Sequence, residues 1–486
     1  MTLPVDLLQR RPSPERYDAV VVGAGIAGLT CAAVLARGGA RTLLVEAGKR
    51  AGGQLQTVSH QGYAVDVGPL FWDAAGLAEV FAAVGTSEVE LGALHARDAV
   101  RLVVAREGGS TFEPLRIPVP GGTTSPSTLD AVRSLYGVPP RVFASVGELY
   151  QDLLQASPEQ LEGWRATTLD AWLAERAPEP VVAAAMRRSA LLLGAQAPER
   201  ASPAMLAQHA RWLASPRAPG IMTAGDGPVA GTRGIVQGLV DACIDAGVEL
   251  RLGTRATGMG IVRNRFGKLQ VRREEHAFAD EVLAEHCVLA LPRAAFAGVL
   301  TSEVRHALDA SFPPVAGFGA VGVAWALRGV PEMRGAGSPE EAPLVRLVPP
   351  ADASGGTFTA PVTLYWPSLR APRVTPPGHA LLIAQAALPD GATSDAFEVG
   401  RVLALLRTYV REVFPALPEL LDWERHWIHP LGPPDPFVAP ALPSAAPGVK
   451  GLWLAGAEVA TTGALTTGVA AAALSGKEAA DRILGR

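Results

Sequence analysis

The hydrophobic pattern near the N-terminus predicts a strand, a tight turn and a helix. Residues 17–22, YDAVVV, form a short β-branched run that ends at Gly23, and apolar residues with helical spacing follow over 26–35. A second apolar run over 41–45 ends at Glu46 and completes a βαβ unit of about thirty residues. We therefore expect these residues to open a parallel, doubly wound α/β sheet.

The pattern changes in the later parts of the chain. Between about 120 and 224, Pro-bounded helical segments such as TLDAWLAERA replace alternating strands, which predicts a helical insertion. A helix over 234–246 then leads into short strand-like runs separated by Gly or Asn turns. Further runs between 315 and 390 predict a separate mixed sheet, and the chain closes with a strand, a loop and a long helix over 451–484.

Composition bounds the kind of protein. A chain of 486 residues exceeds a usual domain of about 100–200 residues, which favours two domains, one of them interrupted. Lys plus Arg (43) nearly balance Asp plus Glu (47), so no basic footprint for nucleic acid exists. Hydrophobic residues make up 48% and charged residues 19%, which indicates a large core and favours a hydrophobic small molecule as substrate.

Cysteine usage and the N-terminus suggest a location. Cys31, Cys243 and Cys287 lie far apart with no CxxC pair, so we expect neither a disulfide framework nor a zinc site. The first residues lack the apolar segment of a signal peptide, and no apolar stretch reaches the roughly 18 residues of a spanning helix. We therefore expect a cytoplasmic protein and leave peripheral membrane contact by the helical insertion open.

A glycine-rich motif lies at the first turn. Gly23, Gly25 and Gly28 form G-x-G-x-x-G between the strand and the helix, where main-chain N–H groups and the helix dipole can receive a pyrophosphate. Glu46 at the end of the second strand is placed to accept both hydroxyls of an adenosine ribose. The combination predicts a dinucleotide site and leaves FAD and NAD as alternatives.

The next segment resembles a known superfamily. Gly52 and Gly53 follow Glu46 as in E-x5-G-G-R, and Gly62 to Asp66 with Gly68 and Pro69 match a G-x-x-x-D-x-G-P turn. The chain here resembles the FAD-dependent superfamily of amine oxidases, protoporphyrinogen oxidase and phytoene desaturase. Its GP turn is more similar to the desaturase and porphyrinogen oxidase branches, and the chain as a whole most resembles the phytoene desaturase-like branch. The resemblance implies a Rossmann-like FAD-binding domain and a second, substrate-binding domain.

The end and the middle of the chain extend the resemblance. Leu454, Ala455, Gly456 and Glu458 match the family's closing strand, and Gly468, Val469, Ser475 and Gly476 match its last helix, which runs under the flavin. The resemblance also implies that the amide of Ala256 meets the adenine, and that Glu458 lies near the ribityl and diphosphate groups. The sequence around Glu458 is equally compatible with a role of this residue as the partner of a helix N-cap.

The resemblance yields explicit expectations for domains and cofactor. The FAD-binding domain would comprise 1–95, 225–300 and 440–486, and the substrate domain 96–224 and 301–439. We expect FAD to be bound non-covalently, because no cysteine follows Cys287, where amine oxidases attach their flavin. The expected FAD-binding residues are Gly23, Gly25, Ile26, Ala27, Gly28, Glu46, Ala47, Arg50, Gly52, Gly53, Gln54, Gly68, Pro69, Leu70, Ala256, Gly456, Glu458, Gly468 and Val469.

The sequence departs from the family's pattern at several points. Gln54 replaces the arginine after the double glycine, a loss for which Arg50 could compensate. Residues 463–466 bring no aromatic to the flavin, and the strand within about 316–326 lacks the lysine that amine oxidases bridge to the flavin through water. These departures weaken amine oxidation as the expected reaction.

The expected reaction is FAD-dependent dehydrogenation (desaturation) or isomerisation of a hydrophobic, polyene- or carotenoid-like molecule. An amine or amino-acid oxidase, a porphyrinogen oxidase and a redox-silent FAD-binding scaffold remain the alternatives, and no catalytic base is nominated. His426 and His429 have no third metal ligand at suitable spacing, so we expect no metal site. Aromatics that could line a substrate slot, but that core packing explains more commonly, are Trp72, Trp212, Trp325, Tyr365, Trp366 and Trp427.

Overall fold

The computed structural model describes most of the chain, and all structural statements below concern these residues. They are 15–69, 74–86, 91–93, 101–105, 112–116, 140–176, 178–193, 195, 197–214, 222–224, 232–276, 278–312, 318–334, 339, 344–348, 362–369, 371–389, 392–429, 438, 442–461 and 468–486.

The first sheet is built around the N-terminal strand. Strand β1 (Glu15–Val22) pairs in parallel with β2 (Thr42–Val45) and with β12 (Asp280–Leu289). The strand order is β10-β11-β12-β1-β2-β9, and β18 also pairs with β12. The remaining strands of this sheet are β9 (Glu249–Arg251), β10 (Thr254–Val262), β11 (Arg265–Arg273) and β18 (Leu452–Leu454).

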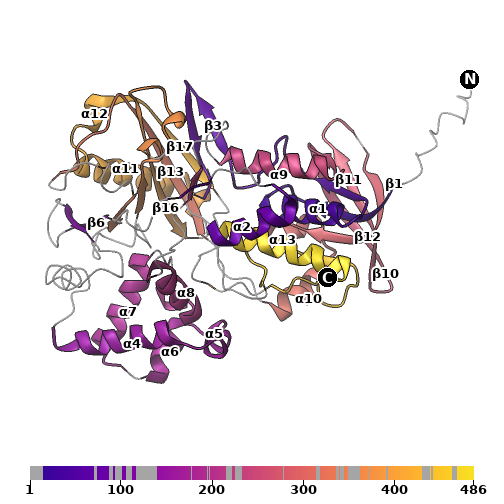
Figure 1. The fold of residues 1–486 in the computed structure, drawn as a ribbon, viewed down its shortest axis with the longest axis horizontal. Coiled ribbons are helices and arrows are strands. Elements are labelled where there is room, and N and C mark those ends of the chain that lie inside the picture. The colour runs from indigo at the N-terminus through magenta and orange to yellow at the C-terminus, as the bar shows by residue number, and fades with distance from the viewer. Residues whose placement is uncertain are drawn as a thin grey trace, which may run out of the picture.

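Helices cover both faces of this sheet, which explains why the second half of β1, Ala19 to Val22, is continuously apolar and buried. Ala19 and Val21 face one cluster of buried side chains, whereas Val20 and Val22 face another. The first cluster is formed with α1 (Ile26–Arg37), α2 (Ala74–Val84), α9 (Arg233–Asp245) and α13 (Gly468–Leu484), and α13 lies alongside α1 in Figure 1. The second includes residues of η4 (Arg293–Gly298) and of α10 (Ser302–Ser311), so this layer extends past residue 300.

A second, mixed sheet lies beside the first (Figure 1). Its strand order is β17-β13-β16-β15-β14-β6-β7. One face packs on the long helix α11 (Ala396–Val413), which buries Trp325 and Phe414. Its strands are β6 (Arg101–Ala105), β7 (Phe112–Arg116), β13 (Phe318–Leu327), β14 (Leu344–Val348), β15 (Val362–Tyr365), β16 (Ala380–Pro389) and β17 (Leu421–His429).

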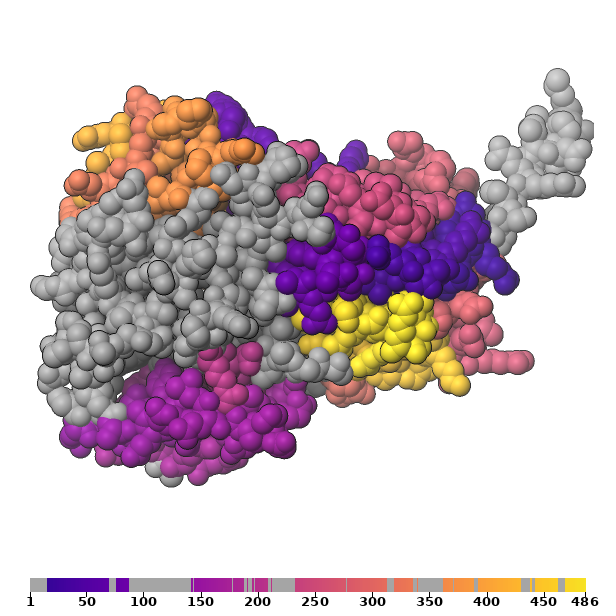
Figure 2. All heavy atoms as spheres, viewed as in Figure 1, coloured from indigo at the N-terminus to yellow at the C-terminus, as the bar shows by residue number. Residues whose placement is uncertain are grey.

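Helices between residues 140 and 214 form a group of their own, which Figure 2 shows as a continuous mass at the lower left. Their shared core contains the fully buried Trp172 and Leu169. These helices occupy the span in which the sequence pattern predicts an insertion. They are α4 (Phe143–Gln155), α5 (Pro158–Trp164), α6 (Leu169–Arg176), α7 (Pro180–Leu193) and α8 (Pro203–Ala214).

A β-hairpin connects the two sheets. Strands β3 (Thr57–His60) and β4 (Tyr63–Asp66) pair with each other, and Tyr63 and Val65 pack against the second sheet. At its other end, the hairpin holds the start of α9 through Thr57 and Asp66. The smaller elements are β5 (Leu91–Ala93), β8 (Met222–Ala224), α12 (Leu417–Leu420), η2 (Pro140–Val142), η3 (Pro198–Arg200), η6 (Pro367–Leu369), η7 (Pro372–Val374) and η8 (Ala392–Ser394).

The predicted fold class is confirmed. The chain forms an α/β structure whose central sheet is parallel around β1 and carries an antiparallel arm, β10 and β11. The second sheet is mixed, since β14 and β6 run parallel while its other pairs are antiparallel. The exact domain boundaries remain a prediction.

Candidate flavin site

The parallel strands of the first sheet end at a common edge. Because β1 pairs in register with both β2 and β12, their last residues Val22, Val45 and Leu289 are neighbours. Loops that follow the carboxyl ends of such strands form the ligand sites of doubly wound sheets. Gly23 and Glu46, the first residues after β1 and β2, are therefore brought together here.

The glycine loop is shaped by two glycines and left open by the third. Gly23 has a φ of 101°, and a Cβ on Gly28 would lie 1.8 Å from the carbonyl oxygen of Gly23. A Cβ on Gly25 would meet only the Cα of Gly53, at 3.9 Å. No side chain caps α1, so the N–H groups of Ile26, Ala27 and Gly28 face this opening, which fits a diphosphate.

The second glycine pair lies against the first loop. The N–H of Gly52 donates to the carbonyl of Ala24 over 2.7 Å, and a Cβ on Gly53 would lie 3.0 Å from the Cα of Gly25. Both Gly52 and Gly53 adopt positive φ values, 118° and 58°. Their lack of side chains therefore allows the two loops to approach.

Arg50 is exposed beside this pair and makes no hydrogen bond or ion pair with the residues that the structure describes. Its guanidinium is thus available to an anion near the loop. Gln54, which stands where the family has arginine, is half-buried. Compensation of Gln54 by Arg50 stays a hypothesis.

Glu46 holds the loops around it together. Its carboxylate accepts hydrogen bonds from the N–H of Ala24 over 2.8 Å and of Gly48 over 2.6 Å. Each carboxylate oxygen retains further acceptor capacity for a ribose hydroxyl. The carbonyl of Glu46 accepts from Thr254 over 2.8 Å, which places the start of β10 beside Ala47. Ala256 follows on β10 and is buried next to a β-bulge.

The GP turn adjoins the double-glycine loop. The N–H of Val67 donates to the carbonyl of Gln56 over 2.9 Å. A Cβ on Gly68 would lie 1.8 Å from the carbonyl oxygen of Gln54, so glycine is required for this contact. Pro69 follows, and Leu70 lies outside the described residues. The structure therefore brings together the two segments that the family resemblance assigns to FAD.

The segment that follows β18 also lies at the edge where the parallel strands of the first sheet end. The N–H of Gly456 donates to Oγ of Ser475 over 2.8 Å, which ties the end of β18 to α13. Gly468 begins α13 with a φ of 61° and has open space around its Cα, while Val469 packs in the same cluster as Ile26 and Ala27.

Glu458 has a clear structural partner. Its carboxylate accepts a hydrogen bond from the N–H of Arg293 over 3.0 Å. Because Arg293 is the first residue of η4, Glu458 caps that helical turn. A role of Glu458 toward FAD stays a prediction.

Sequence reasoning missed two residues that reach this site from the second sheet. The side-chain amide of Gln385 donates to the carbonyl of Gly68 over 2.8 Å, and Nε2 of His429 contacts the carbonyl of Val67. Gln385 interrupts the apolar run of β16, LLIAQAAL. A single polar residue in a buried strand needs a hydrogen-bond partner, and this signal could have identified Gln385.

The aromatic candidates separate into two groups. Trp325 and Trp366 are core residues: the Nε1 of Trp325 donates to Glu424 over 2.8 Å, and Trp366 packs edge-on against Phe414. Trp427 lies on the face of the second sheet that carries Gln385, with its indole over Gly322. Trp72 and the side chain of Trp212 lie outside the described residues.

Tyr365 is buried on the same face of the second sheet as Trp427, in the cluster that receives Tyr63 of the hairpin. His426 and His429, three residues apart on β17, point to opposite faces. Within the described part of the chain, no three His, Cys, Asp or Glu side chains are grouped to hold a metal ion. None of its helices is both long and apolar enough to cross a bilayer.

Comparisons with known proteins agree with this geometry. Residues 26–484 match the model of a family described as flavin containing amine oxidoreductase. The chain is 51% identical over 55 residues to an all-trans-retinol 13,14-reductase of Danio rerio, covering 11% of this chain and 9% of that protein. It is 32% identical over 157 residues to a lycopene-forming phytoene desaturase of a Paracoccus species, covering 32% and 25%. The chain thus spans a small part of these relatives' length.

A solved structure extends the similarity over the whole fold. An oxidoreductase from Methanosarcina mazei matches 95% of this chain and 99% of its own with a TM-score of 0.64, at 14% identity. At that identity the likeness shows the fold. The family match covers nearly the whole chain, and it confirms the resemblance inferred from the glycine motifs. The chain therefore belongs to the flavin containing amine oxidoreductase family, an oxidoreductase family, and FAD is its cofactor.

Proposed function

We propose that the protein dehydrogenates (desaturates) or isomerises a hydrophobic, polyene- or carotenoid-like small molecule. FAD, when bound, supplies the acceptor for a hydride and its two electrons. The protein's own residues would supply an apolar slot, orientation of the substrate and exclusion of water.

The observation that carries the proposal is the chemistry of the sheet face opposite the GP turn. This face is identified by Gln385 and by the packing of Tyr63 against it. On strands β13 and β16 the face carries no ionisable side chain, whereas Arg425 and His429 of the edge strand β17 also lie on it. Its residues on β13 and β16 are Ala320, Gly322, Ala324, Ala326, Leu381, Ile383, Gln385 and Ala387.

Such a face suits a hydrocarbon better than a charged amine. Desaturation or isomerisation of a polyene needs close apolar contact with the flavin and little acid–base assistance. Trp427 adds a flat aromatic surface at the same face, and Gly322 provides the space for its indole. Its Nε1 is buried and has no hydrogen-bond partner among the described residues.

The positions of the lysines argue against the family's amine-oxidising chemistry. Lys49 pairs with Glu274, Lys268 with Glu281, and Lys477 with Glu79 and Asp481. Lys450 lies in a β-bridge with Arg265, at the turn between β10 and β11. None of the four lies on β13, where an amine oxidase would place one.

The names of the relatives support the same substrate class. One is a reductase of retinol and another a desaturase of phytoene, and both names denote a change in saturation. An amine or amino-acid oxidase remains the first alternative because the family is named for amine oxidoreduction. A porphyrinogen oxidase and a redox-silent FAD-binding scaffold are the others.

The test begins with the visible absorption spectrum of the purified protein before and after denaturation and filtration. A two-banded flavin spectrum that passes the filter would establish non-covalent FAD. Anaerobic bleaching of that spectrum is then followed with polyenes, with amines and amino acids, and with a porphyrinogen. A polyene that is desaturated should bleach the flavin, whereas a polyene that is isomerised should change its own absorption spectrum and leave the flavin oxidised.

Each other outcome contradicts the proposal in a different way. Bleaching by an amine alone would show that the protein is an amine oxidase. A flavin that no donor except dithionite reduces, together with a polyene spectrum that does not change, would favour the scaffold.

We further propose that the helices between 140 and 214 touch a membrane surface, from which a lipophilic substrate would enter. Co-sedimentation with phosphatidylcholine vesicles tests this contact. Protein that stays in the supernatant at every lipid concentration would contradict it and leave the proposed reaction untouched.

A further inference from the structure

A basic hollow lies beside the adenosine end of the predicted FAD site. It has a volume of about 350 Å³ and is within the range of small-molecule pockets. Ala47, which follows Glu46, forms part of its wall, and β10 and β11 with their flanking turns form the rest. The lining residues are Ala47, Gly253, Arg255, Arg272, Arg273, Glu274 and His276.

Two of the arginines are placed directly opposite each other. Arg255 on β10 is the cross-strand partner of Arg272 on β11 in the antiparallel register. Like charges in this arrangement destabilise a sheet. Neither arginine forms a hydrogen bond or ion pair with any residue that the structure describes. The fold therefore maintains a repulsive pair that no described protein group relieves.

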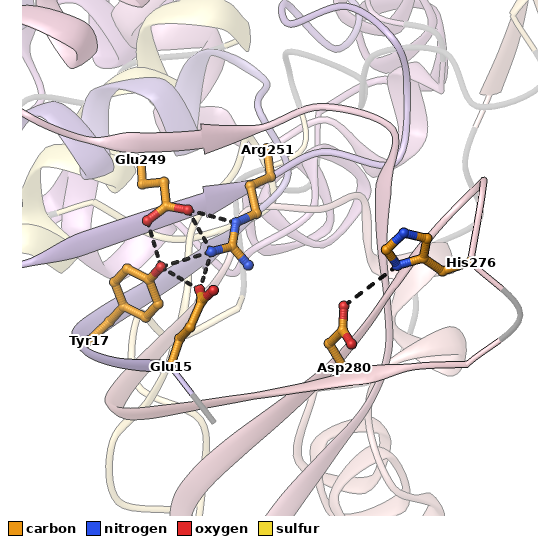
Figure 3. Close-up of polar contacts among 6 residues, drawn as sticks. All are labelled: Glu15, Tyr17, Glu249, Arg251, His276 and Asp280. Carbon is orange, nitrogen blue, oxygen red and sulfur yellow. Dashed lines mark hydrogen bonds and ion pairs between the residues drawn. The ribbon is translucent and has the colours of Figure 1, made fainter. Parts of the chain in front are cut away.

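The carboxylate in the lining of the hollow is already engaged. Glu274, the one acid in the lining, forms an ion pair with Lys49 over 3.2 Å. Asp280 faces His276 at 4.0 Å, as Figure 3 shows. These pairings leave the charge of Arg255 and Arg272 uncompensated.

The nearby acidic residues Glu15 and Glu249 also have partners within the protein. Glu15 and Glu249 both bind the guanidinium of Arg251 and the hydroxyl of Tyr17 (Figure 3). Arg273 is close enough to Glu15 to contribute to the lowering of its pKa, after the larger effects of Arg251 and Tyr17. Arg273 thus has a second carboxylate nearby, whereas no ion pair joins Arg255 or Arg272 to a described carboxylate.

We propose that this hollow binds the phosphate group of a small-molecule ligand other than FAD, held between Arg255 and Arg272. A guanidinium matches phosphate with two parallel N–H donors, and two opposed guanidinium groups can clamp one dianion. The phosphate would relieve the cross-strand repulsion. The volume leaves room for a nucleoside attached to the phosphate, so free phosphate and a nucleotide are two sources of the same chemistry.

The test is calorimetric titration of the flavin-loaded protein with inorganic phosphate and, separately, with adenosine 5′-monophosphate at low ionic strength. We expect saturable binding of one molecule per chain. Equal affinity for both probes would identify phosphate alone as the ligand, whereas tighter binding of the nucleotide would show that the nucleoside occupies the rest of the hollow.

Variants locate the binding in the hollow. Arg255→Gln with Arg272→Gln is expected to weaken binding at least tenfold, whereas Arg265→Gln, at the opposite end of β11, is expected to leave it unchanged. Because both lining arginines are exposed, the double variant should fold, with an unfolding temperature at or above that of the parent. Phosphate should raise the unfolding temperature of the parent and of Arg265→Gln but not of the double variant.

Three results would overturn the proposal. They are no binding to the flavin-loaded parent, binding that the double variant retains, and binding that occurs only after the flavin is removed. The last would make the hollow part of the FAD site itself. None of these readouts depends on turnover, so the proposal stands or falls independently of the proposed function.

Discussion

Gln385 donates a hydrogen bond from its side-chain amide to the main-chain carbonyl of Gly68 over 2.8 Å, across 317 positions of sequence. The contact joins β16 of the second sheet to the turn that the family resemblance assigns to FAD. The imidazole of His429 contacts the preceding carbonyl, that of Val67. The second sheet therefore holds the shape of this turn.

Removal of the Gln385 amide should weaken FAD binding. We expect Gln385→Leu to raise the dissociation constant for FAD about fivefold, since a hydrogen bond of this kind contributes about 1 kcal/mol. Quenching of FAD fluorescence measures the effect, and Gln237→Leu, on the exposed side of α9, is the control. An unchanged affinity would show that the turn keeps its shape without Gln385.

Two glycines of the first loop should have different roles, Gly25 in cofactor binding and Gly28 in folding. Gly25→Ala should fold normally, because its φ of −73° is ordinary and the space beside it is open, yet the new methyl group would occupy the diphosphate's path. Gly28→Ala should fail to fold, because its Cβ would collide with the carbonyl oxygen of Gly23 at 1.8 Å.

Circular dichroism and flavin content distinguish these two outcomes. We expect Gly25→Ala to show a parental melting curve and at least a tenfold loss of FAD affinity. A Gly25→Ala protein that is as yellow as the parent would place the diphosphate elsewhere.

The crossing of α1 and α13 also depends on one glycine. A Cβ on Gly476 would lie 2.1 Å from the carbonyl oxygen of Ala27, so Gly476→Ala should destabilise the protein by about 1–3 kcal/mol or more. Gly400→Ala is the matched control. It is an exposed residue of α11 with nothing near its Cβ position, and it should stabilise by roughly 0.5–1 kcal/mol. Denaturant unfolding should therefore shift in opposite directions for the two alanines.

Asp66 caps α9 with a single oxygen. Its Oδ1 accepts from Oγ1 of Thr57 over 2.6 Å and from the N–H and the hydroxyl of Thr232 over 2.8 and 3.1 Å. Burial raises the pKa of Asp66 more than these hydrogen bonds lower it, so folding favours its neutral form. The stability due to Asp66 thus decreases as the pH rises through its raised pKa.

Asparagine keeps the accepting oxygen without the charge. We expect Asp66→Asn to unfold at or above the parental temperature at pH 7, and Asp66→Ala to lose about 1–3 kcal/mol because the donors lose their acceptor. Equal stability of the two variants would show that the hydrogen bonds accepted by Oδ1 of Asp66 do not stabilise the fold.

Acid should destabilise the cluster around Arg251. The hydrogen bond from Arg251 lowers the pKa of Glu15. The pKa of Glu249 is also lowered, because hydrogen bonds from Tyr17 and Arg251 outweigh the opposing effect of burial. Carboxyl groups with lowered pKa values stabilise the fold above their unfolded pKa, near 4.3, and this stability is lost as the pH falls through the folded values.

Melting temperatures of the parent and of Arg251→Met between pH 3 and 7 test this. We expect the variant to melt lower at pH 7 and the gap to close toward pH 3, while Arg265→Met shows no such convergence. A gap that stays constant over this range would mean that Arg251 acts through packing alone.

Local features of the chain made much of this fold predictable. The strand at 17–22, the helix from Ile26 and the spacing to Glu46 are patterns within about thirty residues, and the structure contains each of them. The glycine motifs could be located because glycine marks positions of unusual backbone conformation, and backbone conformation is a local property.

The contacts between the sheets could not be predicted in this way. Gln385 meets Gly68 across 317 positions and Asp66 meets Thr232 across 166, so both contacts form only after the chain has folded back on itself. His429 was considered for metal binding because of its neighbour His426, yet its contact is a distant carbonyl. Nothing in local periodicity specifies which strand of one sheet faces which turn of another.

The contact of α1 with α13 also bears on how the protein is made. Strand β1 and helix α1 leave the ribosome early, but Ala27 gains its cover at Gly476 only when residues 468–484 have been synthesised. At a translation rate of about 5–20 residues per second, the interval is roughly 20 to 90 seconds. During that time the first helix exposes the apolar surface that its late partner buries, so this nascent chain should depend on chaperones until translation has passed α13.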